Sequence, residues 1–201
     1  MNKCVKNLFL FLMITVLAVG FTACGGASEQ NGAEKTVETF INALADFDSE
    51  TAKSCLKNGE TSSIILDGRN YNKESMVQSY VDVGISEETA DKIMDLVAET
   101  NKKAITFKIT DTKDNGKKTT VTVAFSVKDP ADLWDEILIS NEVLEAYGSN
   151  DQGMAVLKSY ELLSEKLETA TPASVNVKFT LEKADDKWVI SEMDENISKV
   201  Y

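Results

Sequence analysis

The stretch AITFKITDTKDNGKKTTVTVAFSV, residues 104–127, carries the clearest structural pattern in the sequence. On both sides of a polar centre, apolar residues alternate with polar ones: Ile105, Phe107 and Ile109 before it, and Val121, Val123, Phe125 and Val127 after it. A period of two is typical of strands with one buried face. The stretch therefore predicts a β-hairpin.

The length of the hairpin loop follows from this alternation. Residues that face each other across two strands lie on the same side of the sheet, so pairing odd with odd positions requires an odd number of loop residues. We predict the three-residue loop Asp114-Asn115-Gly116, with Gly116 in the left-handed position of a bulge. Ile109 is then expected opposite Val121.

Helical periodicity precedes the hairpin. Residues 36–47 place apolar side chains at a spacing of three and four, which predicts an amphipathic helix. Asp48 is expected to cap a short second helix, and Lys73 to begin another that breaks at Gly84. Ser86 should cap a further helix that leads up to the first strand.

A second helical region and a second hairpin follow. Asp129-Pro130 suits the start of a helix that runs to about Tyr147 and ends at a break near Gly148 and Gly153. A second helix is expected to end near Thr169, before the alternating segment VNVKFTLEKADDKWVISEM. The predicted fold class is α+β: N-terminal helices packed on a curved antiparallel sheet of about four strands, with a two-helix insertion between the two hairpins.

The first residues have the layout of a signal peptide. Lys3 and Lys6 precede an uncharged apolar run from Leu8 to Val19. This run is shorter than the roughly 20 residues that a membrane-spanning helix needs. We interpret residues 1–23 as a removable leader.

The end of the leader, Phe21-Thr22-Ala23-Cys24, resembles the lipobox of bacterial lipoproteins, although Phe21 stands where Leu is usual. The resemblance implies that Cys24 receives diacylglycerol, that cleavage occurs before it, and that acyl chains such as palmitate anchor the protein. An ordinary secreted protein cut after Ala23 is the alternative. The expected location is the extracytoplasmic face of a bacterial cell membrane, with residues 24–35 as a flexible tether and 36–201 as one domain.

The composition restricts the chemistry. The chain has a formal net charge of −12, no histidine and a single arginine, Arg69. A basic surface for nucleic acid is absent, and catalysis by Ser-His-Asp or Cys-His groups is excluded. The acidic pairs Asp185-Asp186 and Asp194-Glu195 are interpreted as turn and solvated residues, so no metal and no cofactor are expected.

The chain as a whole resembles a known group of proteins. The leader, the tether, the opening helix TVETFINALADFD, the helical insertion and the terminal LEKADDKWVISEM resemble bacterial lipoproteins of unknown function whose domains have the nuclear-transport-factor-2-like cone fold. The resemblance implies helices packed on a strongly curved sheet around a pocket. The long insertion, residues 129–172, departs from the simple cone and could cover or fill that pocket.

Two classes of function remain. The favoured one is a non-catalytic module that binds a small ligand, a peptide or another envelope protein through the pocket or the insertion helices. The alternative is an envelope hydrolase or isomerase that uses carboxylate and tyrosine groups, as cone-fold enzymes do. Trp134 and Tyr147 are candidate ligand-facing aromatics, with a core location as their alternative, and Arg69 could hold one anion.

Overall fold

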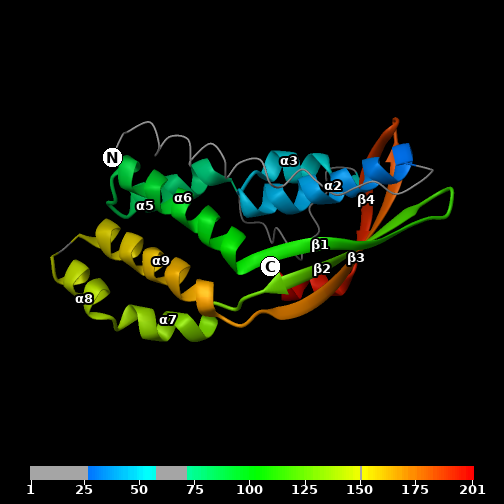
Figure 1. Ribbon diagram of the computed structural model, residues 1–201. Helices are drawn as coiled ribbons and strands as arrows, with labels where there is room; N and C mark the ends of the chain where they lie inside the picture. Colours follow the sequence, from blue (N-terminus) through cyan, green and yellow to red (C-terminus); the bar gives the residue numbers. More distant parts are fainter. Residues whose placement is uncertain (1–26, 58–71, 150) are drawn as a thin grey trace, which may run out of the picture.

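The computed structural model describes residues 27–57, 72–149 and 151–201, which form helices and one antiparallel sheet (Figure 1). The elements are, in chain order, α2 (Ala27–Ala45), α3 (Ser49–Ser54), α5 (Lys73–Asp82), α6 (Glu87–Ala104), β1 (Ile105–Asp114), β2 (Thr119–Val127), α7 (Ala131–Leu138), α8 (Asn141–Gly148), α9 (Gln152–Thr169), β3 (Ala173–Ala184), β4 (Lys187–Met193) and the 3-10 helix η2 (Glu195–Lys199). The predicted α+β class is confirmed. None of the helices in these ranges is long and apolar enough to cross a membrane.

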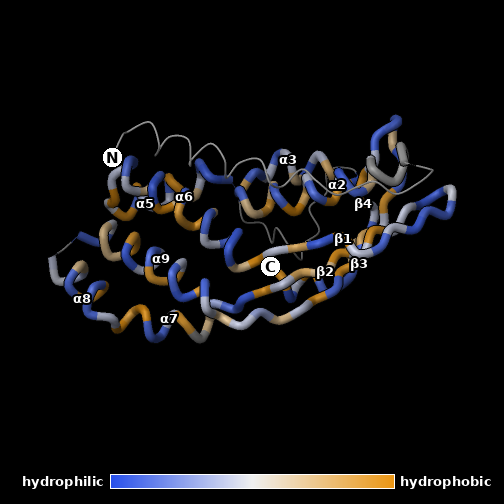
Figure 2. The backbone as a smooth tube through the Cα atoms, viewed as in Figure 1, coloured by the Kyte–Doolittle hydropathy of each residue, from blue (hydrophilic) through white to orange (hydrophobic). Residues whose placement is uncertain are grey.

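The sheet has four strands in the order β1-β2-β3-β4, and α2 covers one face of it (Figure 1). The alternating residues of β2 and β3 point to this face and are fully or almost fully buried: Val121, Val123, Phe125, Val177, Phe179 and Leu181. Phe40 of α2 meets Phe179 nearly edge to face, with ring centroids 6.2 Å apart. Alternation in the strands and the helical stripe of α2 therefore build one shared core, visible as facing orange segments in Figure 2.

The first hairpin differs from its predicted register. Ile109 pairs with Val123, not with Val121, and the chain reverses over residues 115–118, where the Asn115 N–H donates to the Lys118 carbonyl over 3.1 Å. Thr110 is the extra residue of a β-bulge. The bulge shifts the pairing by one residue. The loop can therefore contain an even number of residues while the apolar side chains of both strands still lie on one buried face of the sheet.

The helix α2 begins earlier than the sequence indicates. Ala33 is fully buried, and the Thr112 hydroxyl donates to the Glu34 carboxylate over 2.6 Å. Gly32 lies against Trp188 of β4 so closely that a Cβ atom there would be 2.7 Å from Cδ1 of the indole. Residues 27–35 of the expected tether, residues 24–35, are therefore helical. Small residues allow this part of the helix to pack without a large apolar side chain.

The helices α5 to α9 form what we call the helical lobe, which extends beyond the sheet (Figure 1). Two apolar clusters hold it together, one around Ile93 and Met94 of α6 and one around Ile137 and Leu167. The hydroxyl of Ser86 accepts from the backbone of α6, as predicted. β1 then follows α6 without a loop, so the lobe is joined directly to the sheet.

The insertion between the hairpins holds three helices and not the two that we expected. The hydroxyl of Ser140 accepts the backbone N–H of Val143 and starts α8, which breaks the first expected helix after Leu138. The helix α7 starts at Ala131, whose N–H donates to the Asp129 carboxylate. A serine cap inside an apolar stretch was the signal for this break.

Candidate functional site

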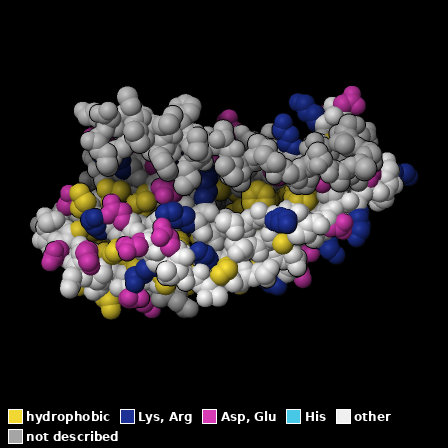
Figure 3. All heavy atoms as spheres, viewed as in Figure 1, with side chains coloured by type: hydrophobic (Ala, Val, Ile, Leu, Met, Phe, Trp, Pro, Cys, Tyr) yellow, Lys and Arg dark blue, Asp and Glu magenta, His cyan; other side chains and the backbone are white. Residues whose placement is uncertain are grey.

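A cavity of about 640 Å³ lies where the end of the sheet meets α2 and α6. The described residues that line it come from four segments of the chain: Ile41, Asn42, Leu44, Ala45, Phe47, Asn101, Lys102, Ala104, Ile105, Thr106, Phe107, Val127, Lys128, Pro130, Val200 and Tyr201. In Figure 3 hydrophobic side chains are exposed near the centre of the view, over the region between α2 and β1. The cavity is within the size range of small-molecule sites.

Apolar side chains from facing elements form the walls. Ile41 and Leu44 belong to the stripe of α2 that also packs on the sheet. Ile105 and Phe107 lie on the inner face of β1, and the ring of Phe107 is 6.1 Å from that of Phe125. The apolar stripe of α2 and the inner face of β1 thus contribute side chains to both the core and the cavity wall.

Phe47 closes the end of α2 and carries backbone strain. Its φ is +57°, a left-handed conformation that bulky residues rarely adopt. The Asp48 N–H donates to the Ala43 carbonyl and the Phe47 N–H to that of Leu44, which is the Schellman arrangement of a helix end. Glycine is usual at this position, so the buried phenyl ring must compensate for a strain of roughly 1–3 kcal/mol.

Polar groups of the lining hold neighbouring elements together. The Lys102 ammonium lies 2.5 Å from the carboxylate of Asp46, and this ion pair joins α6 to the end of α2. The Lys128 ammonium donates to the carbonyl of Leu167 over 2.5 Å, which ties the end of β2 to α9. Both contacts frame the cavity with positive groups.

Tyr201 completes the lining. Its hydroxyl lies 3.5 Å from the carbonyl of Ile41 and donates to it in a long hydrogen bond. Partial burial raises the pKa of the Tyr201 phenol above its ordinary value. The hydroxyl is therefore protonated at neutral pH and can act as a hydrogen-bond donor, not as a base.

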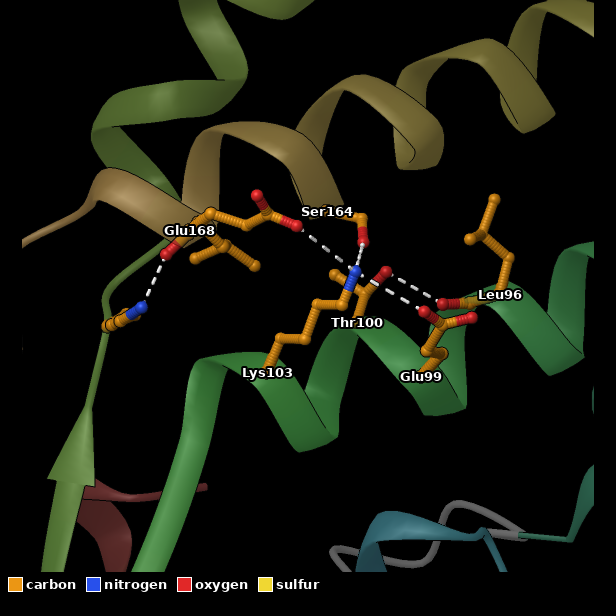
Figure 4. Close-up of polar contacts among 8 residues, drawn as sticks. Leu96, Glu99, Thr100, Lys103, Ser164 and Glu168 are labelled. Atoms are coloured by element: carbon orange, nitrogen blue, oxygen red, sulfur yellow. Dashed lines mark hydrogen bonds and ion pairs between the residues drawn. The ribbon is translucent and has the colours of Figure 1, made fainter. Parts of the chain in front are cut away.

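A polar network beside the cavity fixes α6 against α9 (Figure 4). The Lys103 ammonium donates to the Ser164 hydroxyl over 2.8 Å and lies 3.3 Å from Glu99 and 3.8 Å from Glu168. The Thr100 hydroxyl donates to the carbonyl of Leu96. Lys102, at the cavity rim, immediately precedes Lys103 in α6. The network that holds Lys103 therefore also helps to position the rim.

Of the predicted site residues, the structure describes Trp134 and Tyr147, and it places them on different helices away from the cavity. Trp134 is half-buried on α7 and meets Tyr160 of α9 edge to face, with centroids 5.2 Å apart, whereas Tyr147 is exposed on α8. Neither side chain lines the cavity. Arg69 and Cys24 lie outside the described residues.

Sequence reasoning did not single out the residues that do line the cavity. Asn101 and Lys102 look like ordinary solvated residues near a helix end, and Tyr201 like part of a tail. The available signal was the abrupt change from helix to strand at Ala104, since such a junction leaves a corner that a neighbouring helix must cover. In the ranges that the structure describes, acidic and cysteine side chains form no cluster suited to a metal ion.

Comparison with known proteins yields structural neighbours alone. No model of a known protein family matches the chain, and no curated protein sequence matches it. A crystal structure from Bacillus subtilis, described as a "putative lipoprotein", is 18% identical with a TM-score of 0.41 and covers 83% of this chain. This chain spans 58% of the length of that protein.

Two further structures are similar. A ketosteroid isomerase-like protein from Erwinia carotovora is 10% identical with a TM-score of 0.38, over 84% of this chain and 95% of its own. A protein of unknown function from Mycobacterium tuberculosis is 9% identical with a TM-score of 0.31, over 100% of this chain and 89% of its own.

Proposed function

We propose that the protein is a lipid-anchored envelope lipoprotein with a nuclear-transport-factor-2-like domain that binds a small, mainly apolar molecule in the cavity between α2, α6 and β1. The observation that carries the proposal is the cavity itself, about 640 Å³ with a mostly apolar lining. The lipobox ending at Cys24 supports the anchor, because two or three acyl chains hold a domain to a bilayer where one barely does.

The lining suits binding and orientation. Apolar walls remove the body of a ligand from water, which contributes about 25 cal/mol per Å² of buried apolar surface. Asn101, Lys102 and Lys128 offer hydrogen-bond donors at the rim, and the described lining residues include no Asp or Glu, although the Asp46 carboxylate beside the rim is paired with Lys102. A molecule with an apolar body and one anionic or carbonyl group would match these features, whereas acid-base turnover would need a carboxylate that is free of an ion pair, and Asp46 is paired with Lys102.

A fluorescent fatty acid tests the cavity directly. Titration of dansylated undecanoic acid into the chain from residue 24 onward, made with Cys24→Ser, should increase dansyl fluorescence to saturation. Ala45→Trp should abolish this increase, because Ala45 lines the cavity and an indole would occupy the space. Saturating ligand should also raise the melting temperature of the wild type, by mass action.

Ala124→Trp is the matched control. Ala124 is also half-buried, but it lies on β2 at a position that alternates with the core-facing residues and so faces away from α2. This variant should bind the probe like the wild type. Equal binding by wild type and Ala45→Trp would show that the cavity is not the site, and ester hydrolysis by the purified chain would favour the enzyme alternative.

A further inference from the structure

The outer surface of α7, α8 and the start of α9 exposes large apolar side chains. Leu138, Ile139, Leu144, Tyr147 and Met154 are all exposed, with Ile139 at 72% and Leu144 at 53%. In the rest of the described chain, Val83 and Tyr201 are the exposed large hydrophobic residues. Such concentration in one short segment is typical of an interaction surface.

These side chains are not needed for packing the lobe. The inner faces of the same helices already bury Ile137 and Val143 completely. Leu144 and Tyr147 lie three residues apart on α8, so they are neighbours on its outer face. The segment thus has an apolar inner face that builds the core and a second apolar face directed to solvent.

The same segment is purely acidic. Residues 129–157 include seven Asp or Glu residues and no Lys or Arg, so they supply more than half of the net charge of −12. Glu136 pairs with Lys166 of α9, whereas Asp135, Glu142 and Glu145 make no ion pair within the described ranges. In Figure 3 acidic side chains are frequent on the helical half of the molecule, with Lys side chains of neighbouring elements among them.

We propose that this surface, the exposed residues of 135–154, docks an amphipathic segment of a partner protein whose apolar stripe is flanked by Lys or Arg side chains. The apolar residues would supply buried area, and the acidic ones would attract the partner and orient it. Docking at this surface does not require a ligand in the cavity.

The charge argues against two other occupants. A second copy of this chain would bring an acidic surface against the same acidic surface in a two-fold dimer, because a symmetric contact pairs like with like. A bilayer with anionic lipids would also repel the acidic segment, because both carry negative charge. A cationic partner removes both conflicts.

Binding of a model peptide tests the proposal. The full chain is held in zwitterionic lipid nanodiscs, and a labelled helical peptide of Leu and Lys at amphipathic spacing is titrated in, with empty discs as the reference. We expect saturable binding that weakens as salt rises. The double variant Leu144→Asn with Tyr147→Asn should weaken it about tenfold with unchanged melting temperature, because both side chains are already exposed.

A charge-matched pair of variants separates docking from general attraction. Glu142→Gln with Glu145→Gln removes two charges from the surface, and Asp185→Asn with Asp186→Asn removes two from the β3–β4 turn. The first variant should weaken peptide binding several-fold and the second should leave it nearly unchanged. Equal losses from the two variants, binding that ignores Leu144 and Tyr147, or dimers through this face in sedimentation would each overturn the proposal.

Discussion

Two aromatic residues of the insertion, Trp134 and Tyr147, have similar sequence contexts but different environments in the structure. Trp134 and Tyr147 both follow a leucine or alanine within acidic helical segments. Trp134 packs between α7 and α9 against Tyr160, whereas the side chain of Tyr147 projects from α8. The difference arises from which face of each helix meets α9, and helical spacing within one segment does not specify that.

Truncation of these two side chains should therefore have unequal effects. Trp134→Ala should lower the free energy of unfolding by about 2–3 kcal/mol, below the roughly 3–5 kcal/mol of a fully buried aromatic because the ring is half-buried. Tyr147→Ala should change it by less than about 0.5 kcal/mol, as at an ordinary surface position. Urea denaturation followed by circular dichroism measures both. Similar losses for the two variants would contradict this assignment of roles.

Among the elements, the first hairpin shows how far local rules reach. Both strands and the left-handed conformation of Gly116 were predicted, and its φ is +84°. The three-residue loop and the pairing of Ile109 with Val121 were wrong, because the bulge at Thr110 changes the register. A bulge has no clear signature in a run of Thr, Asp and Lys, and alternation requires an odd loop only where both strands are regular.

Two glycines with open space around them allow a controlled test of this turn. A Cβ atom at Gly116 or at Gly148 would meet nothing within 4 Å, but only Gly116 of the two has a positive φ. Gly116→Ala should cost about 1 kcal/mol of stability through backbone strain. Gly148→Ala should stabilise the protein by about 0.4–1 kcal/mol, since alanine restricts the unfolded chain. Thermal and chemical unfolding of both variants measure the difference, and a neutral Gly116→Ala would refute the strain.

At the scale of the whole molecule, net charge and attachment have to be explained together. An acidic chain is not attracted to an anionic bilayer, so a membrane location would depend on lipid at Cys24. The helix α2 begins at Ala27, three residues after this cysteine in the sequence, and Gly32 of this helix packs against Trp188 of β4. Any flexible spacer between lipid and domain is therefore shorter than the tether we predicted, which would hold the domain close to the bilayer.

The anchor is testable by metabolic labelling. Cys24→Ser should abolish incorporation of an alkyne fatty acid and leave the precursor uncut, because the thiol is the expected acceptor of the lipid. The melting temperature of the folded domain should not change, since Cys24 precedes the described fold. Cys55→Ser is the control for labelling, because Cys55 is buried in the core and should take up no lipid. Equal labelling of wild type and Cys24→Ser would exclude the lipoprotein assignment.

Local periodicity and helix capping could be predicted from the amino-acid sequence alone. Alternation identified all four strands, helical spacing identified the amphipathic helices, and Asp48 and Ser86 were recognised as caps that the structure contains. These features follow from neighbours within a few residues, where side-chain chemistry and backbone geometry are directly coupled.

The register of the first hairpin, the early start of α2 and the cavity depend on contacts between residues that are far apart in the sequence, so local patterns did not predict them. Gly32 packs in a helix against Trp188, far away in the sequence, so closely that a side chain at this position would meet the indole. The cavity combines residues from α2, α6, both strands of the first hairpin and the last residues of the chain, and each of these segments satisfies its own pattern without it. A cavity forms where packed helices and strands leave the corner between them unfilled. It therefore cannot be predicted from a local sequence pattern.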